Sequence, residues 1–253
     1  MERHILLTLA FDGTRYHGFQ VQKNALTVCE VLQDAMQKTL GERPDVKGCS
    51  RTDAGVHASG FCLSFFTESH IPLQRLPLAL NDSLPPDIRV LAAREVPENF
   101  HARYDAHSKE YRYRIRTGSI DSPFDAPYTW RVNGKPDGEK MQRAADACLG
   151  AHDFRSFMSR GSGAGEDTVR RVDFFQVEKE ENVLTITIRA DGYLYNMVRI
   201  LVGTLVEIGM GRLPEDSMGR ILKARDRGAA GPTAPAKGLC LTKVFYKTFF
   251  ETG

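Results

Sequence analysis

The chain has 253 residues, 42% of them hydrophobic, which is enough for one large or two smaller domains with real cores. Its 34 basic and 32 acidic residues leave a net charge of +2, which excludes binding to a polyanion by bulk charge alone. The five cysteines form no CxxC pair, no run of about eighteen apolar residues occurs and the N-terminus lacks a signal-peptide cleavage site, so we expect a cytoplasmic protein without membrane, disulfide or zinc framework.

The first half of the chain predicts alternating strands and helices. The clearest element is a helix that starts after Thr27, where Thr27 and Glu30 form a TxxE capping box and Gly41 follows the last helical turn. The predicted order is a strand at 5–12, this helix, a short strand at 46–49, a strand at 58–66, a helix at 73–80 and a strand at 88–95.

The second half repeats that order of elements. It predicts a strand at 110–116, a helix at 138–149, a hairpin of 172–179 with 183–190, helices at 195–208 and 215–224, and a strand at 239–246. Both halves read β-α-β-β-α-β, the order of the ferredoxin-like unit. We therefore expect an α+β protein with two ferredoxin-like domains, 1–102 and 103–253, whose mainly antiparallel sheets form a cleft suited to a polymer or to a small molecule.

The loop RTDAGVHA lies between two predicted strands and places Arg51 two residues before Asp53. Its polar groups are a candidate ligand site, although a plain surface turn is the simpler interpretation because Asp and Gly are ordinary turn residues. A metal site is disfavoured, since Asp53 and His57 lack further His or Cys neighbours at ligand spacing. His57 is more typical of a packed or capping histidine than of a base.

The strand KEYRYRIR carries two stripes, with Tyr111, Tyr113 and Ile115 on one face and Arg112, Arg114 and Arg116 on the other. One interpretation is a core strand with solvated arginines. The other is a nucleic-acid surface, on which aromatic rings stack on unpaired bases and guanidinium groups contact phosphates. The pattern alone leaves both open.

Arg199 stands in the middle of the apolar helix YNMVRILVGTLVEIG. It either snorkels to solvent or, if buried, faces an acid such as Asp53. Gly203, one turn later, would allow another segment to approach this helix closely. The stretch DRGAAGPTAPAKG predicts an ordered loop beside the site, and the Gly- and Ser-rich stretch 159–171 is a candidate RNA-contacting loop.

Five blocks together, HGFQ, GCSRTDAGVHASG, NFHARYDAHSKEYRYRI, MVRILVGTLVEIG and DRGAAGPTAPAKGLCL, resemble the tRNA pseudouridine synthase A family over nearly the whole chain. The resemblance implies that Asp53 is the nucleophile and that Tyr111 stacks on the target uracil. It also places Arg51 and Arg199 at the active site. Phe19 stands where many members of the family carry tryptophan, which is a conservative change.

The resemblance further implies a homodimer that modifies the anticodon stem-loop of tRNA, at nucleotides 38–40, in an RNA-binding cleft and without metal or cofactor. Three alternatives stay open. A paralogue with the same motifs could act on other RNA such as rRNA, and a non-catalytic RNA-binding module could share the platform. A hydrolase could use Asp53 to cleave a glycosidic bond, but it would need a second acid, and none is evident beside Asp53.

Overall fold

The computed structural model describes residues 2–118, 120, 122–159 and 167–247. The chain divides into two compact units, unit 1 with Met1–His107 and Leu241–Gly253, and unit 2 with Ser108–Cys240. The sequence-based division at residue 102 stays a prediction. Of the candidate loop 159–171, residues 160–166 lie outside the described residues.

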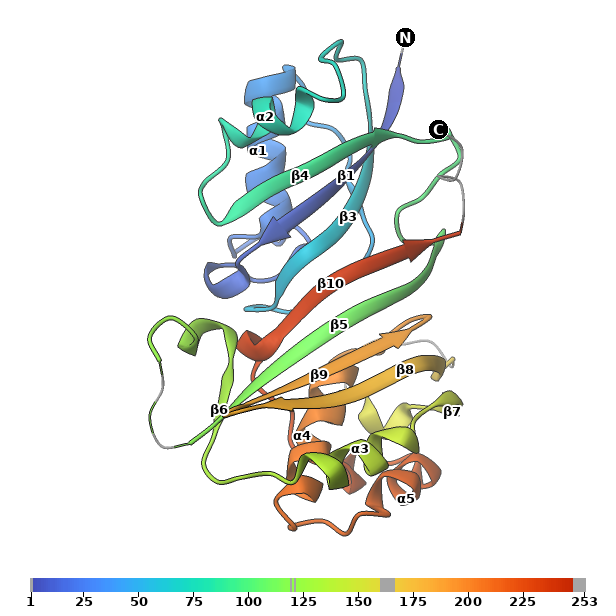
Figure 1. Cartoon of the computed structure of the whole chain (residues 1–253). Coiled ribbons are helices and arrows are strands. Elements are labelled where there is room, and N and C mark those ends of the chain that lie inside the picture. Colours follow the sequence, from blue (N-terminus) through green and yellow to red (C-terminus); the bar gives the residue numbers. More distant parts are fainter. Residues whose placement is uncertain (1, 119, 121, 160–166, 248–253) are drawn as a thin grey trace. The chain divides into compact units, whose positions relative to one another are not determined.

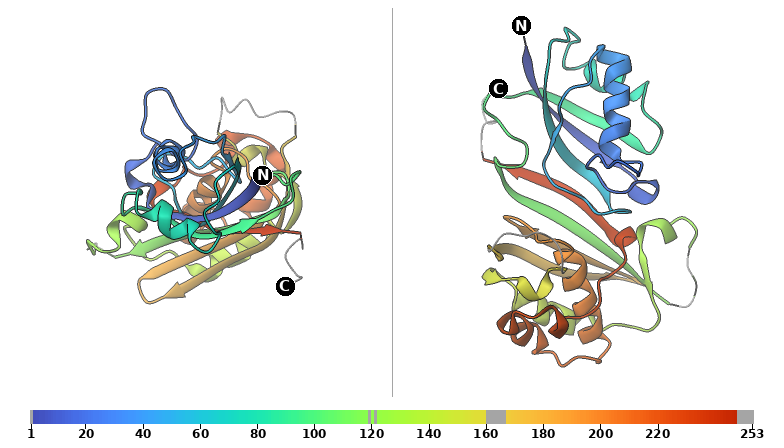
Figure 2. Two further views of the ribbon diagram at one scale, coloured as in Figure 1. Left: turned by 90° about the horizontal axis from the view of Figure 1, so that it is seen from above. Right: turned by 180° about the vertical axis from the view of Figure 1, so that it is seen from behind.

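Unit 1 has a sheet with two helices on one face (Figures 1 and 2). Its elements are β1 (Arg3–Phe11), α1 (Val28–Leu40), β2 (Lys47–Gly48), β3 (His57–Thr67), α2 (Leu76–Asn81), β4 (Ile88–Glu95) and, from Leu241 onward, β10 (Leu239–Tyr246). The strand order is β4-β1-β3-β10, with β2 on β3. The pairs β1/β3, β1/β4 and β2/β3 are antiparallel.

The predicted cap fixes the position of α1. The Thr27 hydroxyl accepts a hydrogen bond from the Glu30 N–H at 3.3 Å, and Gly41 ends the helix in the left-handed conformation with φ 79°. The inner face of α1 supplies Leu32 and Met36, both fully buried, to the core of unit 1. Capping and periodicity are local properties, so the sequence predicts this helix well.

Unit 2 combines further strands with three α-helices. Its elements are β5 (Ala106–Thr117), β6 (Trp130–Val132), α3 (Gly138–Asp146), β7 (Gly150–Asp153), β8 (Val169–Glu180), β9 (Val183–Ala190), α4 (Met197–Gly209) and α5 (Ser217–Ala224). The strands β5, β9, β8 and β7 pair in that order and are antiparallel, whereas β6 runs parallel to β5. Helix α3 packs on β8 and on α4.

Several predicted boundaries differ from the structure by a few residues, and three helix ends are examples. The helix expected at 195–208 starts at Met197, because Asn196 has φ 60° and cannot continue a right-handed helix. The helix expected at 73–80 starts at Leu76, with Pro77 in its first turn. The helix expected to reach residue 149 ends at Asp146, and Gly150, expected only as its stop, begins β7 with φ 94°.

The described residues thus form a mixed α+β protein with five α-helices and mostly antiparallel strand pairing. The five cysteines are free, and four of them are buried. None of the described helices combines the length and the apolar character that crossing a membrane requires.

Candidate active site

The Asp53 loop joins β2 to β3 in unit 1 and is shaped by backbone hydrogen bonds. The Val56 N–H donates to the Asp53 carbonyl at 3.2 Å and closes a turn, in which Gly55 has φ 78°. The Gly55 N–H donates to the Tyr16 carbonyl at 3.1 Å, which ties the turn to the segment after β1. Asp53 itself is half-buried and Arg51 is exposed.

Two glycines of the segment 12–18 let it lie directly against this loop. A Cβ atom on Gly18 would come within 2.1 Å of the Thr52 carbonyl oxygen, and one on Gly13 within 2.0 Å of the Val56 carbonyl oxygen. Gly18 also has φ 81°, a conformation that other residues rarely adopt. The motifs HGFQ and RTDAGVH therefore belong to one structure, although about thirty residues separate them in the chain.

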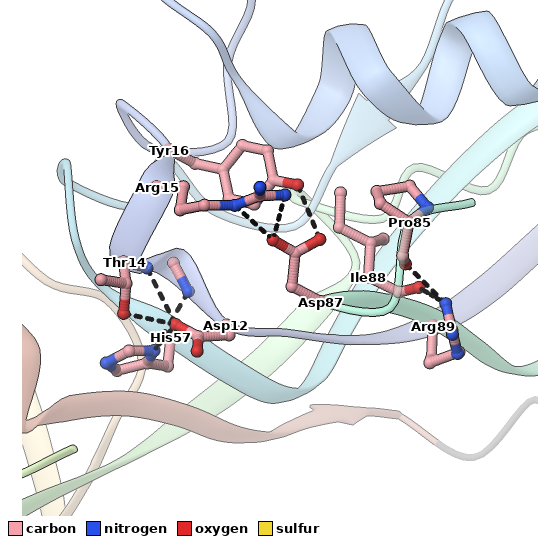
Figure 3. A network of polar contacts seen from close by, with 10 residues as sticks. Asp12, Thr14, Arg15, Tyr16, His57, Pro85, Asp87, Ile88 and Arg89 are labelled. Atoms are coloured by element: carbon pink, nitrogen blue, oxygen red, sulfur yellow. Dashed lines mark hydrogen bonds and ion pairs between the residues drawn. The ribbon is translucent and has the colours of Figure 1, made fainter. Parts of the chain in front are cut away.

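His57 fastens the start of β3 to the same segment (Figure 3). It is 6% exposed, and its Nδ1 accepts a hydrogen bond from the Gly13 N–H at 3.0 Å. The Asp12 carboxylate lies 3.2 Å from the same ring nitrogen and also accepts the Thr14 N–H at 2.9 Å. The interpretation of His57 as a packed residue is confirmed.

Asp87, which precedes β4, anchors the segment from its other side (Figure 3). Its carboxylate pairs with the Arg15 guanidinium at 2.7 Å and accepts a hydrogen bond from the Tyr16 hydroxyl at 2.9 Å. Burial raises the pKa of Tyr16, and the bond to Asp87 adds to that shift, so the hydroxyl stays a donor at neutral pH. The Tyr16 carbonyl accepts the Gly55 N–H, so Asp87, by holding Tyr16, also helps to hold the Asp53 loop in place.

Thr52 adds a feature that the sequence does not signal. Its Oγ1 atom is buried and has no hydrogen-bond partner among the described residues. Such a hydroxyl is costly, by about 1–3 kcal/mol, and it stands directly beside the candidate nucleophile Asp53. Only the packed structure shows that this hydroxyl is buried.

In unit 2, Tyr111 lies on β5 with its ring 6% exposed. The ring meets that of Tyr193 edge-on, with centroids 5.0 Å apart and an interplanar angle of 85°. The Tyr193 hydroxyl lies 2.9 Å from the Lys109 carbonyl and 3.0 Å from the Ile188 carbonyl, which share its single hydrogen as acceptors, and burial raises its pKa. Tyr193 thus fixes the orientation of Tyr111. The sequence does not signal this role, because Tyr193 follows β9 in a segment without helix or strand periodicity.

Tyr113, on the same face of β5, is a core residue. It is fully buried, and its hydroxyl donates to the Pro235 carbonyl at 2.7 Å. Burial raises the pKa of this hydroxyl. A Cβ on Gly238 would come within 2.6 Å of the Tyr113 ring, so the loop after α5 closes directly over it. The core interpretation of the aromatic stripe is confirmed for Tyr113.

The arginine stripe of β5 does not act as one unit. Arg116 pairs with the Asp125 carboxylate at 2.8 Å, and Arg114 lies 3.9 Å from the same group. Arg112 is exposed and has no ion pair with the residues that the structure describes. Within this stripe, Arg112 therefore has the positive charge most available to a ligand.

Arg199, on α4, is half-buried, and its guanidinium is held by groups of its own unit. Its Nε donates to the Ala234 carbonyl at 2.7 Å and its Nη1 to the Asn196 side-chain oxygen at 2.8 Å. The Asn196 amide in turn donates to the Ser159 hydroxyl at 2.8 Å. The Asn196 backbone lies in the left-handed region, a strained conformation for a residue at the start of a helix. In this conformation its side chain accepts the hydrogen bond from Arg199. The pairing of Arg199 with Asp53 stays a prediction.

The loop 226–238 is ordered against α4, as the sequence predicts. A Cβ on Gly203 would come within 1.8 Å of the Pro232 carbonyl oxygen, which confirms that this glycine permits close approach. The Gly231 N–H donates to the Thr204 hydroxyl at 2.9 Å. This contact brings Ala234 to Arg199, so the loop positions the arginine.

The four residues singled out by the sequence divide evenly, with Arg51 and Asp53 in unit 1 and Tyr111 and Arg199 in unit 2. The structure gives each a fixed local setting except Arg51, which has no hydrogen bond or ion pair with the described residues. Within that described part, no three His, Cys, Asp or Glu side chains gather as the ligands of a metal ion would.

Comparison with known proteins adds an independent observation. A family model described as tRNA pseudouridine synthase matches residues 8–105 and 144–247. A protein from Thermoanaerobacter sp. (strain X514) named tRNA pseudouridine synthase A is 46% identical over 244 residues, which cover 96% of this chain and 100% of that protein. A protein of the same name from Citrifermentans bemidjiense is 43% identical over 246 residues, covering 97% of this chain and 98% of that protein.

Among solved structures, a chain of a Cbf5-Nop10-Gar1 complex aligns with a TM-score of 0.38 and 10% sequence identity, covering 93% of this chain and 57% of that chain. This likeness is too low to carry an argument about the fold or the site. The family model, by contrast, spans the blocks that surround Asp53 and Arg199, and the curated relative aligns with 96% of this chain.

Proposed function

The chain belongs to the tRNA pseudouridine synthase family, and we propose on that premise that it isomerises uridine to pseudouridine in the anticodon stem-loop of tRNA with Asp53 as its nucleophile. The observation that carries the proposal is the match along nearly the whole chain, with Asp53 set in a turn that other segments hold in place. The enzyme is accordingly an isomerase that acts within one RNA molecule.

The chemistry needs few catalytic groups. Uridine and pseudouridine are isomers, so the C1′–N1 bond breaks, the base turns, a C1′–C5 bond forms, and the hydrogen lost from C5 is balanced by one gained at N1. A carboxylate can act as the nucleophile directly, without a neighbouring base to activate it. Attack at C1′ of the sugar or at C6 of the base both agree with this role for Asp53.

The target uridine must leave its stack before the reaction. We assign the ring of Tyr111 to the flipped uracil, because stacking on an aromatic ring is worth about 1–3 kcal/mol per base. Its edge-on contact with Tyr193 supports a fixed ring orientation. Arg51, exposed and unpaired within the described residues, is assigned to the RNA, and Arg199 to the orientation of the reacting groups.

The finer features of the proposal rest on the resemblance of the sequence blocks to the family. These are the choice of the anticodon stem-loop, the homodimer, the RNA-binding cleft and the description of the fold as two ferredoxin-like domains. The observation in unit 1 that supports the last of these is the strand order β4-β1-β3, with β2 paired to β3 beside β10.

The test is the variant Asp53→Asn, which keeps nearly the same volume and removes the anion. We expect pseudouridine formation in an unmodified tRNA transcript to disappear while the dissociation constant for that tRNA stays within about threefold of wild type. Mapping pseudouridine nucleotide by nucleotide in the product identifies the site, and binding is measured separately by filter retention.

Three results would contradict the proposal. Appreciable turnover by Asp53→Asn would remove Asp53 as the nucleophile. Release of free uracil would indicate glycosidic hydrolysis. Pseudouridine found in an rRNA transcript and absent from the tRNA would assign the enzyme to another RNA.

A further inference from the structure

A pocket of about 420 Å³ opens on unit 1, and Asp53 is not among the residues that line it. Its inner wall includes Phe19, Cys29 and Gly48, contributed by the segment before α1, by α1 and by β2. The volume lies in the range of pockets that bind small ligands, roughly 300–1,000 Å³. Burial raises the pKa of the Cys29 thiol to about 11, so this thiol is neutral at physiological pH.

Cationic groups dominate the rim of this pocket. Lys47 is paired with Asp45 at 2.6 Å, so these two charges offset each other. Arg51 and Arg103 also line the pocket, and neither guanidinium forms an ion pair with the residues that the structure describes. Two uncompensated guanidinium groups favour an anionic ligand, and their planar donors suit a phosphate in particular.

An aromatic ring stands beside these cations. Tyr104 is 75% exposed, and its ring centroid lies 4.3 Å from that of His101. The Arg103 guanidinium carbon lies 5.7 Å from the Tyr104 ring centroid. The turn that carries the ring is closed by hydrogen bonds. The Asp105 N–H donates to the His101 carbonyl at 3.1 Å, the His101 N–H donates to the Asp105 carboxylate at 2.7 Å, and the Arg103 N–H donates to His101 Nδ1 at 3.0 Å.

A large exposed ring on a fixed turn, next to guanidinium groups, matches the requirements of an unpaired nucleotide, which offers a π-face and a phosphate. We propose that this pocket binds a second unpaired nucleotide of the RNA substrate, close in sequence to the target uridine, by stacking on Tyr104 and by phosphate contacts with Arg51 and Arg103. The inference rests on the proposed function, since it takes RNA as the ligand. Arg51 lies two residues before Asp53 and links the pocket to the catalytic loop.

The experiment is a double-mutant cycle read in binding. Wild type, Tyr104→Ala and Tyr104→Phe are titrated with the unmodified tRNA and with a set of tRNAs that each carry one abasic nucleotide in the anticodon loop. Tyr104→Ala should weaken binding of the intact tRNA about 5- to 100-fold, the range that stacking of one base supplies, while Tyr104→Phe should bind like wild type. Phe124→Ala, which removes another ring that is 87% exposed, is the matched control and should bind like wild type.

The cycle locates the nucleotide. At one position other than the target uridine, an abasic nucleotide should weaken wild-type binding as much as Tyr104→Ala weakens binding of the intact tRNA. The same abasic tRNA should bind Tyr104→Ala no more weakly than the intact tRNA does, because both changes delete the same contact. Arg103→Gln should reduce the slope of log affinity against log salt by about one, as the loss of one phosphate contact does.

The outcomes separate this proposal from the proposed function. If the Tyr104→Ala loss is the same for every abasic tRNA, or if no loss occurs, the nucleotide pocket is refuted, whether or not the wild type forms pseudouridine. If the wild type forms no pseudouridine but the cycle identifies one nucleotide, the pocket stands and the proposed reaction fails. Light scattering measures whether Tyr104→Ala forms an assembly of different mass from the wild type. Such a difference, without any nucleotide-specific coupling, would assign this face to contacts between protein chains and overturn the proposal.

Discussion

The Asp53 loop of unit 1 and helix α4 of unit 2, which carries Arg199, are both held by close backbone contacts at glycines, but they differ in how deeply they are buried. In each, glycines let a distant segment press its backbone against the site, Gly18 on Thr52 in the first and Gly203 on Pro232 in the second. The Asp53 loop depends on a few backbone hydrogen bonds around a half-buried side chain. Helix α4 is buried along most of its length and forms part of the core of unit 2.

This difference in burial predicts which property a substitution in each region should change. A disturbance of the loop moves Asp53, the proposed nucleophile, while the core stays intact, so it should appear mainly in turnover. A disturbance of α4 separates core elements and should appear mainly in the free energy of unfolding. Paired glycine substitutions test this contrast, since each site has a matched glycine with open space around it.

The largest effect is expected for Gly203→Ala. Its Cβ would lie 1.8 Å from the Pro232 carbonyl oxygen, so either the loop 226–238 or α4 must move. We expect a loss of about 3 kcal/mol or more in the free energy of unfolding, at the upper end of overpacking costs, measured by urea titration.

Gly219→Ala is the control for this change. Gly219 lies in α5 with nothing within 4 Å of a Cβ, so alanine should stabilise the protein by about 0.5–1 kcal/mol through its higher helix propensity. Equal stability of the two variants would show that the loop does not press on α4.

The second effect is expected for Gly18→Ala, whose Cβ would lie 2.1 Å from the Thr52 carbonyl oxygen beside Asp53. A shift of a catalytic group by about 1 Å costs roughly 100-fold in turnover, so if Asp53 is the nucleophile as proposed, kcat should fall by about that factor. Single-turnover rates with saturating enzyme measure the chemical step without product release.

Gly41→Ala separates backbone strain from displacement of the loop. Gly41 has φ 79°, close to the 81° of Gly18, but nothing lies within 4 Å of its Cβ. Alanine there should cost about 1 kcal/mol of stability and leave kcat unchanged. If Gly41→Ala slowed turnover as much as Gly18→Ala, strain rather than contact with Thr52 would explain both.

The smallest effect concerns charge at the end of α4. The Glu207 carboxylate accepts two hydrogen bonds from Arg212, at 2.6 and 2.7 Å, and this contact lowers the pKa of Glu207. A carboxyl group with a lowered pKa in the folded state stabilises it above the pKa of the unfolded chain, and the contribution is lost as the pH falls through the folded pKa.

Glu207→Gln should therefore cost about 0.5–1 kcal/mol at pH 7, the scale of an exposed ion pair, and nothing at a pH below the folded pKa. Unfolding curves of both proteins across a pH series measure the difference, and kcat should not change. A gap that persisted in acid would mean that Glu207 stabilises α4 by packing rather than by charge.

The sequence by itself determined the local features of both regions. The capping box at Thr27 and the glycine at 41 predict α1 correctly, and the predicted strands 88–95, 183–190 and 239–246 agree with β4, β9 and β10. Hydrophobic periodicity and caps depend on neighbours within one helical turn or one strand, so they can be read from a single segment. The blocks around Asp53 and Arg199 likewise indicate the family without any coordinates.

Only the tertiary structure decided which segments meet. Contacts that position the candidate site join residues 29 to 71 positions apart in the chain, namely Gly18 with Thr52, Tyr16 with Asp87 and Gly203 with Pro232. The pocket that Tyr104 lines is formed by four separate stretches of the chain. No local pattern specifies such pairs, because they follow from how sheets, helices and loops pack as a whole. The burial of Thr52 Oγ1 and the exposure of Tyr104 have the same origin, since accessibility depends on everything that packs around a side chain.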